Sequence, residues 1–202
     1  MKTIVLDGVR YLRHDYVNEA ELEDRFWSHA KHIFGPDVVI LPRAKIRTSG
    51  DVAAIPDGFV VDVKNRVWFI VEVELARHDL FNHIVPQVSK FASAARNSAT
   101  RSWLTDLFYR ALKDEPPVAS RARDGSSIDL HKLASDLVET KPVLVIAIDE
   151  RTQVLADVVR ELPSEPRVVE FVTFDRDGTR ESCGYRTLTR WRHRRQRAAK
   201  KR

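Results

Sequence analysis

The 202-residue chain has little cysteine, methionine or glycine, and two of these shortages exclude whole classes of site. Its single cysteine, Cys183, allows neither an internal disulfide nor a cysteine-based zinc site. Its seven glycines form no Gly-X-Gly-X-X-Gly or Walker-type loop, and no Gly-X-Ser-X-Gly elbow. The sequence therefore argues against a nucleotide-driven enzyme and against a serine hydrolase.

The chain also lacks a long hydrophobic run. The longest, Val143 to Ile148, is far shorter than the ~18–20 residues that span a bilayer, and it is typical of a buried strand. The first residues reach Asp7 too early for the apolar core of a signal peptide. With 43% hydrophobic residues, the chain can still bury one sizeable core. We therefore expect a soluble, cytoplasmic protein without a membrane partner.

The net charge of +5 is concentrated at one end of the chain. Eight of the 34 basic residues lie between Arg190 and Arg202, where no acid occurs. The other 26 basic residues face 29 acidic ones, so the rest of the chain has a net charge of −3. Such a tail is either a solvated end or an arm that binds phosphates through salt-dependent contacts.

Residue periodicity predicts one α/β domain over residues 1–189, followed by a flexible basic tail over residues 190–202. The expected helices are 18–34, 79–96, 102–113, 128–139 and 152–162, and the expected strands are 3–6, 38–45, 58–63, 67–75, 143–148 and 168–174. Residues 114–127, rich in proline, glycine and serine, are expected to form a loop. This order predicts a mixed sheet with helices on both faces.

Two glutamates interrupt the apolar pattern of the strand expected over 67–75. Alternate side chains of a strand share a face, so Glu72 and Glu74 end the face that begins with Trp68. Their Cβ atoms lie ~7 Å apart, and their flexible side chains can converge on one hard cation. Asp57 begins the partner strand and is expected beside Glu72. These carboxylates suit Mg²⁺, with Mn²⁺ as substitute, because Mg²⁺ takes one or two carboxylates and shares a phosphate oxygen.

The alternative is a solvated strand end, at which Glu72 and Glu74 pair with Lys64, Lys45 or Arg77. The Pro56-Asp57-Gly58 run that begins the preceding strand favours the metal site over this alternative.

Four short motifs, taken in order, resemble the PD-(D/E)XK, or restriction-endonuclease-like, nuclease superfamily over roughly residues 19–148. Pro56-Asp57 resembles its Pro-Asp motif, and the run from Ile70 to Glu74 resembles the strand that carries (Asp/Glu)-X-Lys. Glu19 resembles the acidic residue of the first helix, and the run from Pro86 to Phe91 resembles the Gln-X-X-X-(Tyr/Phe) element. The resemblance implies an α-β-β-β-α-β core with a mixed central sheet, and a helical insertion at about residues 99–141.

The resemblance also implies Mg²⁺-dependent hydrolysis of phosphodiester bonds by six residues. These residues are Glu19, Asp57, Glu72, Glu74, Gln87 and Lys90. Asp57, Glu72 and Glu74 would bind the metal. The position that normally holds lysine holds Glu74, so either Glu74 or Lys90 would activate the attacking water. Glu19 would complete the acidic shell, although it also fits an ordinary acidic helix start, and Gln87 would steady the site.

The expected function is a metal-dependent nuclease, with DNA as the expected partner. The alternative is a non-catalytic module of the same fold, which lost its chemistry with the lysine and binds nucleic acid or a protein. The motifs do not distinguish DNA from RNA or endonuclease from exonuclease, and they leave a homodimer open. Outside the motifs, His78 and His83 are expected to line the cleft or contact phosphate, since no third protein ligand for zinc is obvious.

Overall fold

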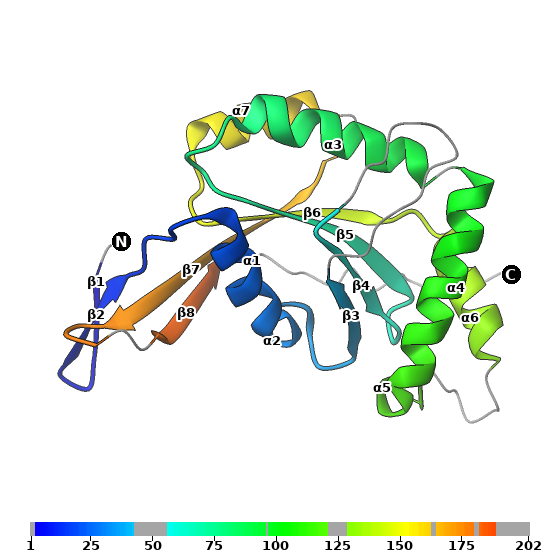
Figure 1. The fold of residues 1–202 in the computed structure, drawn as a ribbon, viewed down its shortest axis with the longest axis horizontal. Coiled ribbons are helices and arrows are strands. Elements are labelled where there is room, and N and C mark those ends of the chain that lie inside the picture. The colour runs from blue at the N-terminus through cyan, green and yellow to red at the C-terminus, as the bar shows by residue number, and fades with distance from the viewer. Residues whose placement is uncertain are drawn as a thin grey trace, which may run out of the picture.

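The computed structural model describes residues 3–42, 56–95, 97–120, 129–162, 165–179 and 182–188. Within these ranges the chain forms a mixed β-sheet with helices on both faces (Figure 1). The strands are β1 (Thr3–Leu6), β2 (Val9–Arg13), β3 (Val38–Pro42), β4 (Gly58–Asp62), β5 (Val67–Glu74), β6 (Val143–Ile148), β7 (Arg167–Arg176) and β8 (Ser182–Leu188). The helices are α1 (Glu19–Ser28), α2 (Ala30–Phe34), α3 (Leu80–Ala94), α4 (Ser98–Asp114), α5 (Pro116–Ser120), α6 (Leu130–Glu139) and α7 (Gln153–Glu161).

The sheet changes from antiparallel to parallel at β5. Strands β3, β4 and β5 form an antiparallel meander, whereas β5, β6 and β7 run parallel to one another. The β1–β2 hairpin extends the sheet beyond β7, and β8 also pairs with β7. Because β5 and β6 are parallel, their carboxyl ends meet at one edge of the sheet.

Two apolar clusters fill the layers on either side of the sheet. On one face α1 and α2 pack through residues such as Phe26, and on the other face α3, α4, α6 and α7 pack through residues such as Phe108. Strand β5 contributes to both clusters, with Phe69 on the α1 side and Trp68 on the opposite side. Burial on both faces explains why its sequence is almost continuously apolar. It also makes Glu72 and Glu74 unfavourable in this strand, because burying a charged side chain costs free energy.

The predicted α/β class, the mixed sheet and its covering helices are confirmed. The hairpin of β4 and β5 forms as expected, and Asp62 stabilises its turn by accepting hydrogen bonds from the backbone and the side-chain amide of Asn65. Asn18 is the N-cap of α1, since its side chain accepts a hydrogen bond from the Glu21 amide.

The helix expected over residues 18–34 is divided into α1 and α2. The Ser28 hydroxyl donates to the Arg25 carbonyl, and His29 Nδ1 lies 2.8 Å from the same oxygen. The His29 amide instead bonds to Phe26, and the helix ends there. Side-chain hydrogen bonds have therefore replaced a helical backbone bond, an effect that periodicity does not reveal.

The loop expected over residues 114–127 begins with the short helix α5. Pro116 and Pro117 occupy its first turn, where the absent amide hydrogen costs no helical bond. The sequence pattern also misses β2 and β8. Asp7 and Gly8 form the turn before β2, with φ values of 51° and 75° that suit a tight hairpin.

Residues 43–45 of the strand expected over 38–45 lie outside the described residues, as does the basic tail from residue 190. Within the described ranges, no helix has both the length and the apolar character that crossing a membrane requires.

Candidate functional site

The β4–β5 hairpin brings Asp57 and Glu72 together as expected. The register pairs Gly58 with Val71, so Asp57 and Glu72 are the next residues outward and share a face of the sheet. One oxygen of Asp57 accepts a hydrogen bond of 2.7 Å from the Val73 amide, which ties this carboxylate to β5. Glu72 is only 6% exposed. The hairpin therefore fixes the positions of both carboxylates.

Gly58 permits this arrangement because α1 approaches β4 closely at this position. A Cβ atom on Gly58 would lie 2.7 Å from the Leu41 carbonyl oxygen and 2.7 Å from a ring carbon of Trp27. Residue 58, next to Asp57, is therefore a glycine because no space remains for a side chain. The Trp27 ring of α1 packs directly against the start of β4.

Glu74 and Glu19 extend this group towards the start of α1, and the four carboxylates Glu19, Asp57, Glu72 and Glu74 are named the acidic cluster. Glu74 is 3% exposed, and its Oε1 accepts from the Leu75 amide and contacts His78 Nδ1. His78 Nδ1 also lies 3.3 Å from an oxygen of Glu19. The first turn of α1 therefore meets the hairpin and the turn that follows it before α3 at the acidic cluster.

Burial and mutual repulsion disfavour the charged forms of Glu72 and Glu19. Burial, together with the charges of Asp57 and Glu74, raises the pKa of Glu72 to about 10. Burial, together with a hydrogen bond and the charge of Glu74, raises the pKa of Glu19 to about 8. A divalent cation at this position would reverse both effects, because an opposite charge favours the ionised carboxylate.

Two buried side-chain oxygens lack hydrogen-bond partners among the described residues, one near the C-terminal end of β5 and the other on α3. They are Oε2 of Glu72 and Oε1 of Gln87. Gln87 follows His83 by one turn of α3, and His83 Nδ1 lies 3.5 Å from Oε2 of Glu74. Buried polar atoms are nearly always satisfied, so the unpartnered oxygen of Glu72 is a candidate ligand atom for a cation.

Lys90 is exposed on α3, one turn beyond Gln87. Residues 83, 87 and 90 follow the spacing of one helical face, so Lys90 continues the side of α3 that begins at the acidic cluster. Within the described part of the chain, Lys90 forms no ion pair with Glu72 or Glu74.

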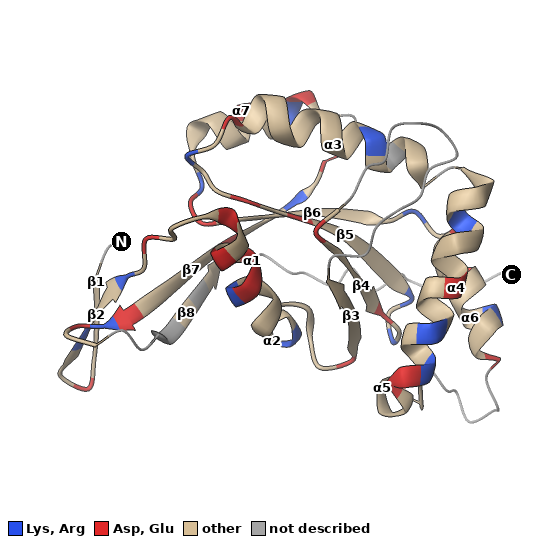
Figure 2. Cartoon of the chain, in the orientation of Figure 1, with Lys and Arg blue, Asp and Glu red and all other residues tan. Residues whose placement is uncertain are grey.

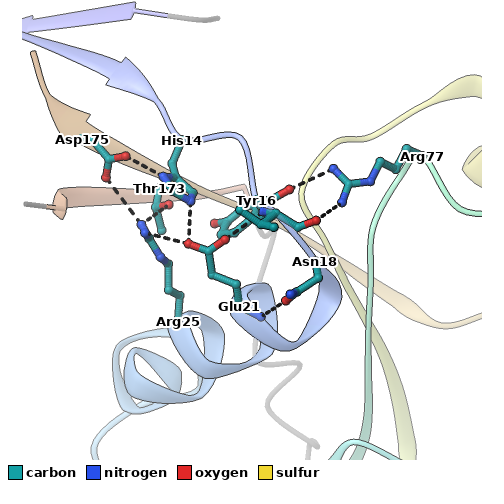
Figure 3. A network of polar contacts seen from close by, with 9 residues as sticks. His14, Tyr16, Asn18, Glu21, Arg25, Arg77, Thr173 and Asp175 are labelled. Atoms are coloured by element: carbon teal, nitrogen blue, oxygen red, sulfur yellow. Dashed lines mark hydrogen bonds and ion pairs between the residues drawn. The ribbon is translucent and has the colours of Figure 1, made fainter. Parts of the chain in front are cut away.

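A second group of charges, the paired network, lies on the opposite side of the first turns of α1. It consists of His14, Glu21, Arg25 and Asp175 (Figure 3). His14 Nε2 lies 2.8 Å from Glu21 and its Nδ1 lies 2.5 Å from Asp175. Arg25 donates to Glu21 at 3.0 Å and approaches Asp175 to 3.5 Å. Each carboxylate of the paired network therefore faces both an imidazole and a guanidinium.

Arg77 connects the segment before α1 to the acidic cluster. Its guanidinium donates to the carbonyl oxygens of Tyr16 and Val17, at 2.9 and 2.7 Å (Figure 3). Arg77 directly precedes His78, and Val17 precedes the cap of α1 by one residue. These two bonds hold the start of α1, and with it Glu19, against the turn that carries His78.

The alternative of a solvated strand end is wrong for Glu72 and Glu74, because both side chains are buried. Arg77 binds backbone carbonyls instead, and Lys64 lies 3.8 Å from Asp37. Lys45 lies outside the described residues.

The structure brings four of the six expected residues into one cluster, with Gln87 and Lys90 along the adjoining helix. Sequence reasoning gave no role to Glu23, which lies one turn after Glu19, is 8% exposed and adds negative charge near Glu72. Its spacing of four residues from Glu19 was the available signal. Figure 2 shows acidic residues on the first turns of α1, where Glu19, Glu21 and Glu23 lie.

The donor set of the acidic cluster fits a divalent cation. Carboxylate oxygens are the ligands that Mg²⁺ and Mn²⁺ take, and the unpartnered Glu72 oxygen supplies a free donor. Comparison with protein-family models, with curated proteins and with solved structures finds no match. Functional conclusions therefore rest on the geometry and chemistry of the cluster.

Proposed function

We propose that the chain is a metal-dependent nuclease that hydrolyses phosphodiester bonds of DNA. The observation that carries this proposal is Glu72, a carboxylate with an unpartnered oxygen whose pKa is raised by its burial and by the charges of Asp57, Glu74 and Glu19. Further support comes from the order α1, β3, β4, β5, α3 and β6, which agrees with the α-β-β-β-α-β core implied by the motifs. The restriction-endonuclease-like fold is part of this proposal.

Asp57 and Glu72 would hold the cation, with Glu74 as the neighbouring ligand. Mg²⁺ bound there would polarise a phosphoryl oxygen and lower the pKa of a bound water. Glu19 closes the acidic cluster from α1. The chain itself supplies a rigid base for these groups, because β5 is central in the sheet and Asp57 is bonded to its backbone.

Glu74 or Lys90 would orient the attacking water or accept its proton. Glu74 is the better placed of the two, since it lies within the cluster and the Leu75 amide and His78 fix its Oε1. Lys90 lies further along α3 and is exposed, so it would have to reach the water from the helix surface. Gln87 would steady the site through its buried amide oxygen.

The test is a cleavage assay with the full chain on single-stranded DNA, double-stranded DNA and RNA, with Mg²⁺ or Mn²⁺. Asp57→Asn should lower cleavage ~100-fold or more, because it removes a metal-binding charge while keeping the side-chain shape. The matched control is Asp136→Asn on the exposed surface of α6, which should leave cleavage unchanged. Absence of cleavage by the wild-type protein, or full activity of Asp57→Asn, would contradict the proposal.

A second candidate function is a non-catalytic module that binds nucleic acid or a protein partner. Glu74 at the position of the motif lysine favours it. The two candidates differ in metal binding, which stabilises a folded protein by ~2.7 kcal/mol at a hundredfold excess over Kd. A working site should therefore show a Tm that rises by ~5–10 °C with Mn²⁺, and a degenerate site should show no rise.

A further inference from the structure

Glu19, Glu74 and His78 form a second set of metal-ligand atoms beside Asp57 and Glu72. One carboxylate oxygen from each glutamate and one imidazole nitrogen lie within 4.8 Å of one another. His78 Nδ1 is 3.3 Å from Glu19 Oε2 and is hydrogen-bonded to Glu74 Oε1. The three residues come from α1, β5 and the turn before α3, and Arg77 holds the first and last of these segments together.

These separations suit a single ion without a large rearrangement. Two ligands at ~2.1 Å from a cation lie ~3.0–3.4 Å apart when they subtend octahedral or tetrahedral angles. Glu19 and His78 already meet this spacing, at 3.3 Å. Glu74 is held in place by burial and by the Leu75 amide, so the smaller adjustments fall on the half-exposed side chains of Glu19 and His78.

The unpartnered oxygen of Glu72 distinguishes this group from an ordinary acidic surface patch. Glu72 is 6% exposed, lies on the same face of β5 as Glu74, and bears a carboxylate oxygen without a hydrogen-bond partner among the described residues. A surface patch would be relieved by water, but this buried group has no such relief. The cluster thus continues inward to a side chain whose ionised form a cation would stabilise.

The imidazole determines which ion this second position prefers. Mg²⁺ favours oxygen ligands and retains its waters, whereas Mn²⁺, Co²⁺ and Zn²⁺ accept imidazole nitrogen readily. We propose that Glu19, Glu74 and His78 form a second cation position, which takes Mn²⁺ or a similar transition-metal ion in preference to Mg²⁺. This inference rests on the proposed function and deepens it, because it assigns a metal preference to the same site. His83, 3.5 Å from Glu74, orients that carboxylate from outside.

Isothermal titration of the metal-free full chain with Mn²⁺ and with Mg²⁺ tests the second position directly. Wild-type protein should bind two Mn²⁺ ions, and His78→Asn should lose one of them, or bind it at least ~10-fold more weakly. Mg²⁺ binding at Asp57 and Glu72 should change less than threefold. The matched control is His131→Asn, an exposed histidine on α6 that should bind both ions as the wild-type protein does.

Glu19→Gln is a second variant, at the partly buried start of α1, and it should lose the same Mn²⁺ ion. Circular dichroism and Tm establish that each variant is folded. Unchanged Mn²⁺ stoichiometry and affinity in both variants would overturn the second position, while Mg²⁺-dependent cleavage would leave the proposed function intact. Absence of any metal binding by the wild-type protein would overturn both.

Discussion

Two groups of charged residues lie on either side of the first turns of α1. A carboxylate pKa is lowered in one group and raised in the other. In the paired network, Glu21 faces His14 and Arg25. Burial alone would raise the pKa of Glu21, but the Val17 amide and these two cations offset it, and the net shift is downward. In the acidic cluster, burial and neighbouring carboxylates raise the pKa of Glu72 to about 10. The same chain therefore stabilises the charged form of Glu21 and disfavours the charged form of Glu72.

This difference supports the proposal that the acidic cluster binds a cation. A protein that only needed stability would gain from placing an arginine or a hydrophobic residue at Glu72, since a buried unpaired charge is costly. Functional sites are the usual places where such a cost persists. Three substitutions and one deletion test the contrast, in order of decreasing expected effect.

Glu72→Gln should stabilise the metal-free protein increasingly as the pH rises. The wild-type pKa is raised from 4.5 to about 10, so folding keeps a proton on Glu72 that the unfolded chain has lost. The stability linked to this proton is complete below pH 4.5 and is lost as the pH rises towards 10. The advantage of the variant should grow by up to ~1.4 kcal/mol per pH unit between pH 5 and 9. Urea unfolding in EDTA at several pH values measures it.

The control is Glu139→Gln, an exposed acid of α6, which should show no such growth. A constant difference between Glu72→Gln and the wild type from pH 5 to 9 would show that Glu72 is already charge-compensated in the protein.

Arg25→Met should act in the opposite direction and destabilise the protein by about 2–3 kcal/mol at pH 7. The change removes a hydrogen bond to Thr173 and the guanidinium group that faces Glu21 and Asp175. The side chain is 23% exposed, so solvent reduces the loss below that of a fully buried pair. Denaturant unfolding measures it, with Arg160→Met on the exposed α7 pair as the control. A loss under 0.5 kcal/mol, as expected of an exposed pair, would mean that the paired network adds nothing.

Gly58→Ala should destabilise the protein by about 1–2 kcal/mol and disturb the acidic cluster but not the paired network. The new methyl group would meet the Leu41 carbonyl oxygen and the Trp27 ring at 2.7 Å, so the backbone beside Asp57 must shift. We expect a lower Tm together with weaker Mn²⁺ binding. Gly178→Ala in the turn after β7 is a comparison variant remote from Asp57, and it should leave Mn²⁺ affinity unchanged. Equal Mn²⁺ affinity in Gly58→Ala and the wild-type protein would show that the position of Asp57 does not affect metal binding.

Deletion of residues 190–202 should leave stability and cleavage at saturating substrate almost unchanged. Eight basic residues are lost, so DNA binding should weaken about equally for all sequences. The dependence of log K on log salt should flatten by up to ~0.9 per lost phosphate contact. Fluorescence titrations at several salt concentrations measure both quantities. An unchanged affinity and slope would identify the tail as a solubilising end.

Local patterns in the sequence were sufficient to predict the centre of the acidic cluster. The alternation along β5 and the short turn at Asn65 determine which residues face each other, so Asp57 beside Glu72 followed from strand geometry. The cap at Asn18 and the class of the fold followed in the same way. These features depend on residues close together in the chain.

Features that depend on distant contacts could not be predicted. The meeting of Glu19 with His78 requires Arg77 to bind the carbonyls of Tyr16 and Val17, and no periodicity encodes that bond. The break between α1 and α2 depends on how His29 turns towards Arg25. The burial of Glu74 arises only when α1, β5 and the turn before α3 have assembled.

The division of the acidic cluster among three segments also determines when its charges meet during folding. Asp57 and Glu72 belong to one hairpin and meet early, because closing a short loop costs little entropy. Glu19 arrives only after α1 has docked on the sheet, and β5 reaches β6 only after four helices have been bridged. Contacts completed this late are weak in the transition state, so a metal bound across them slows unfolding more than it accelerates folding. A cation bound at the acidic cluster would therefore prolong the lifetime of the folded chain.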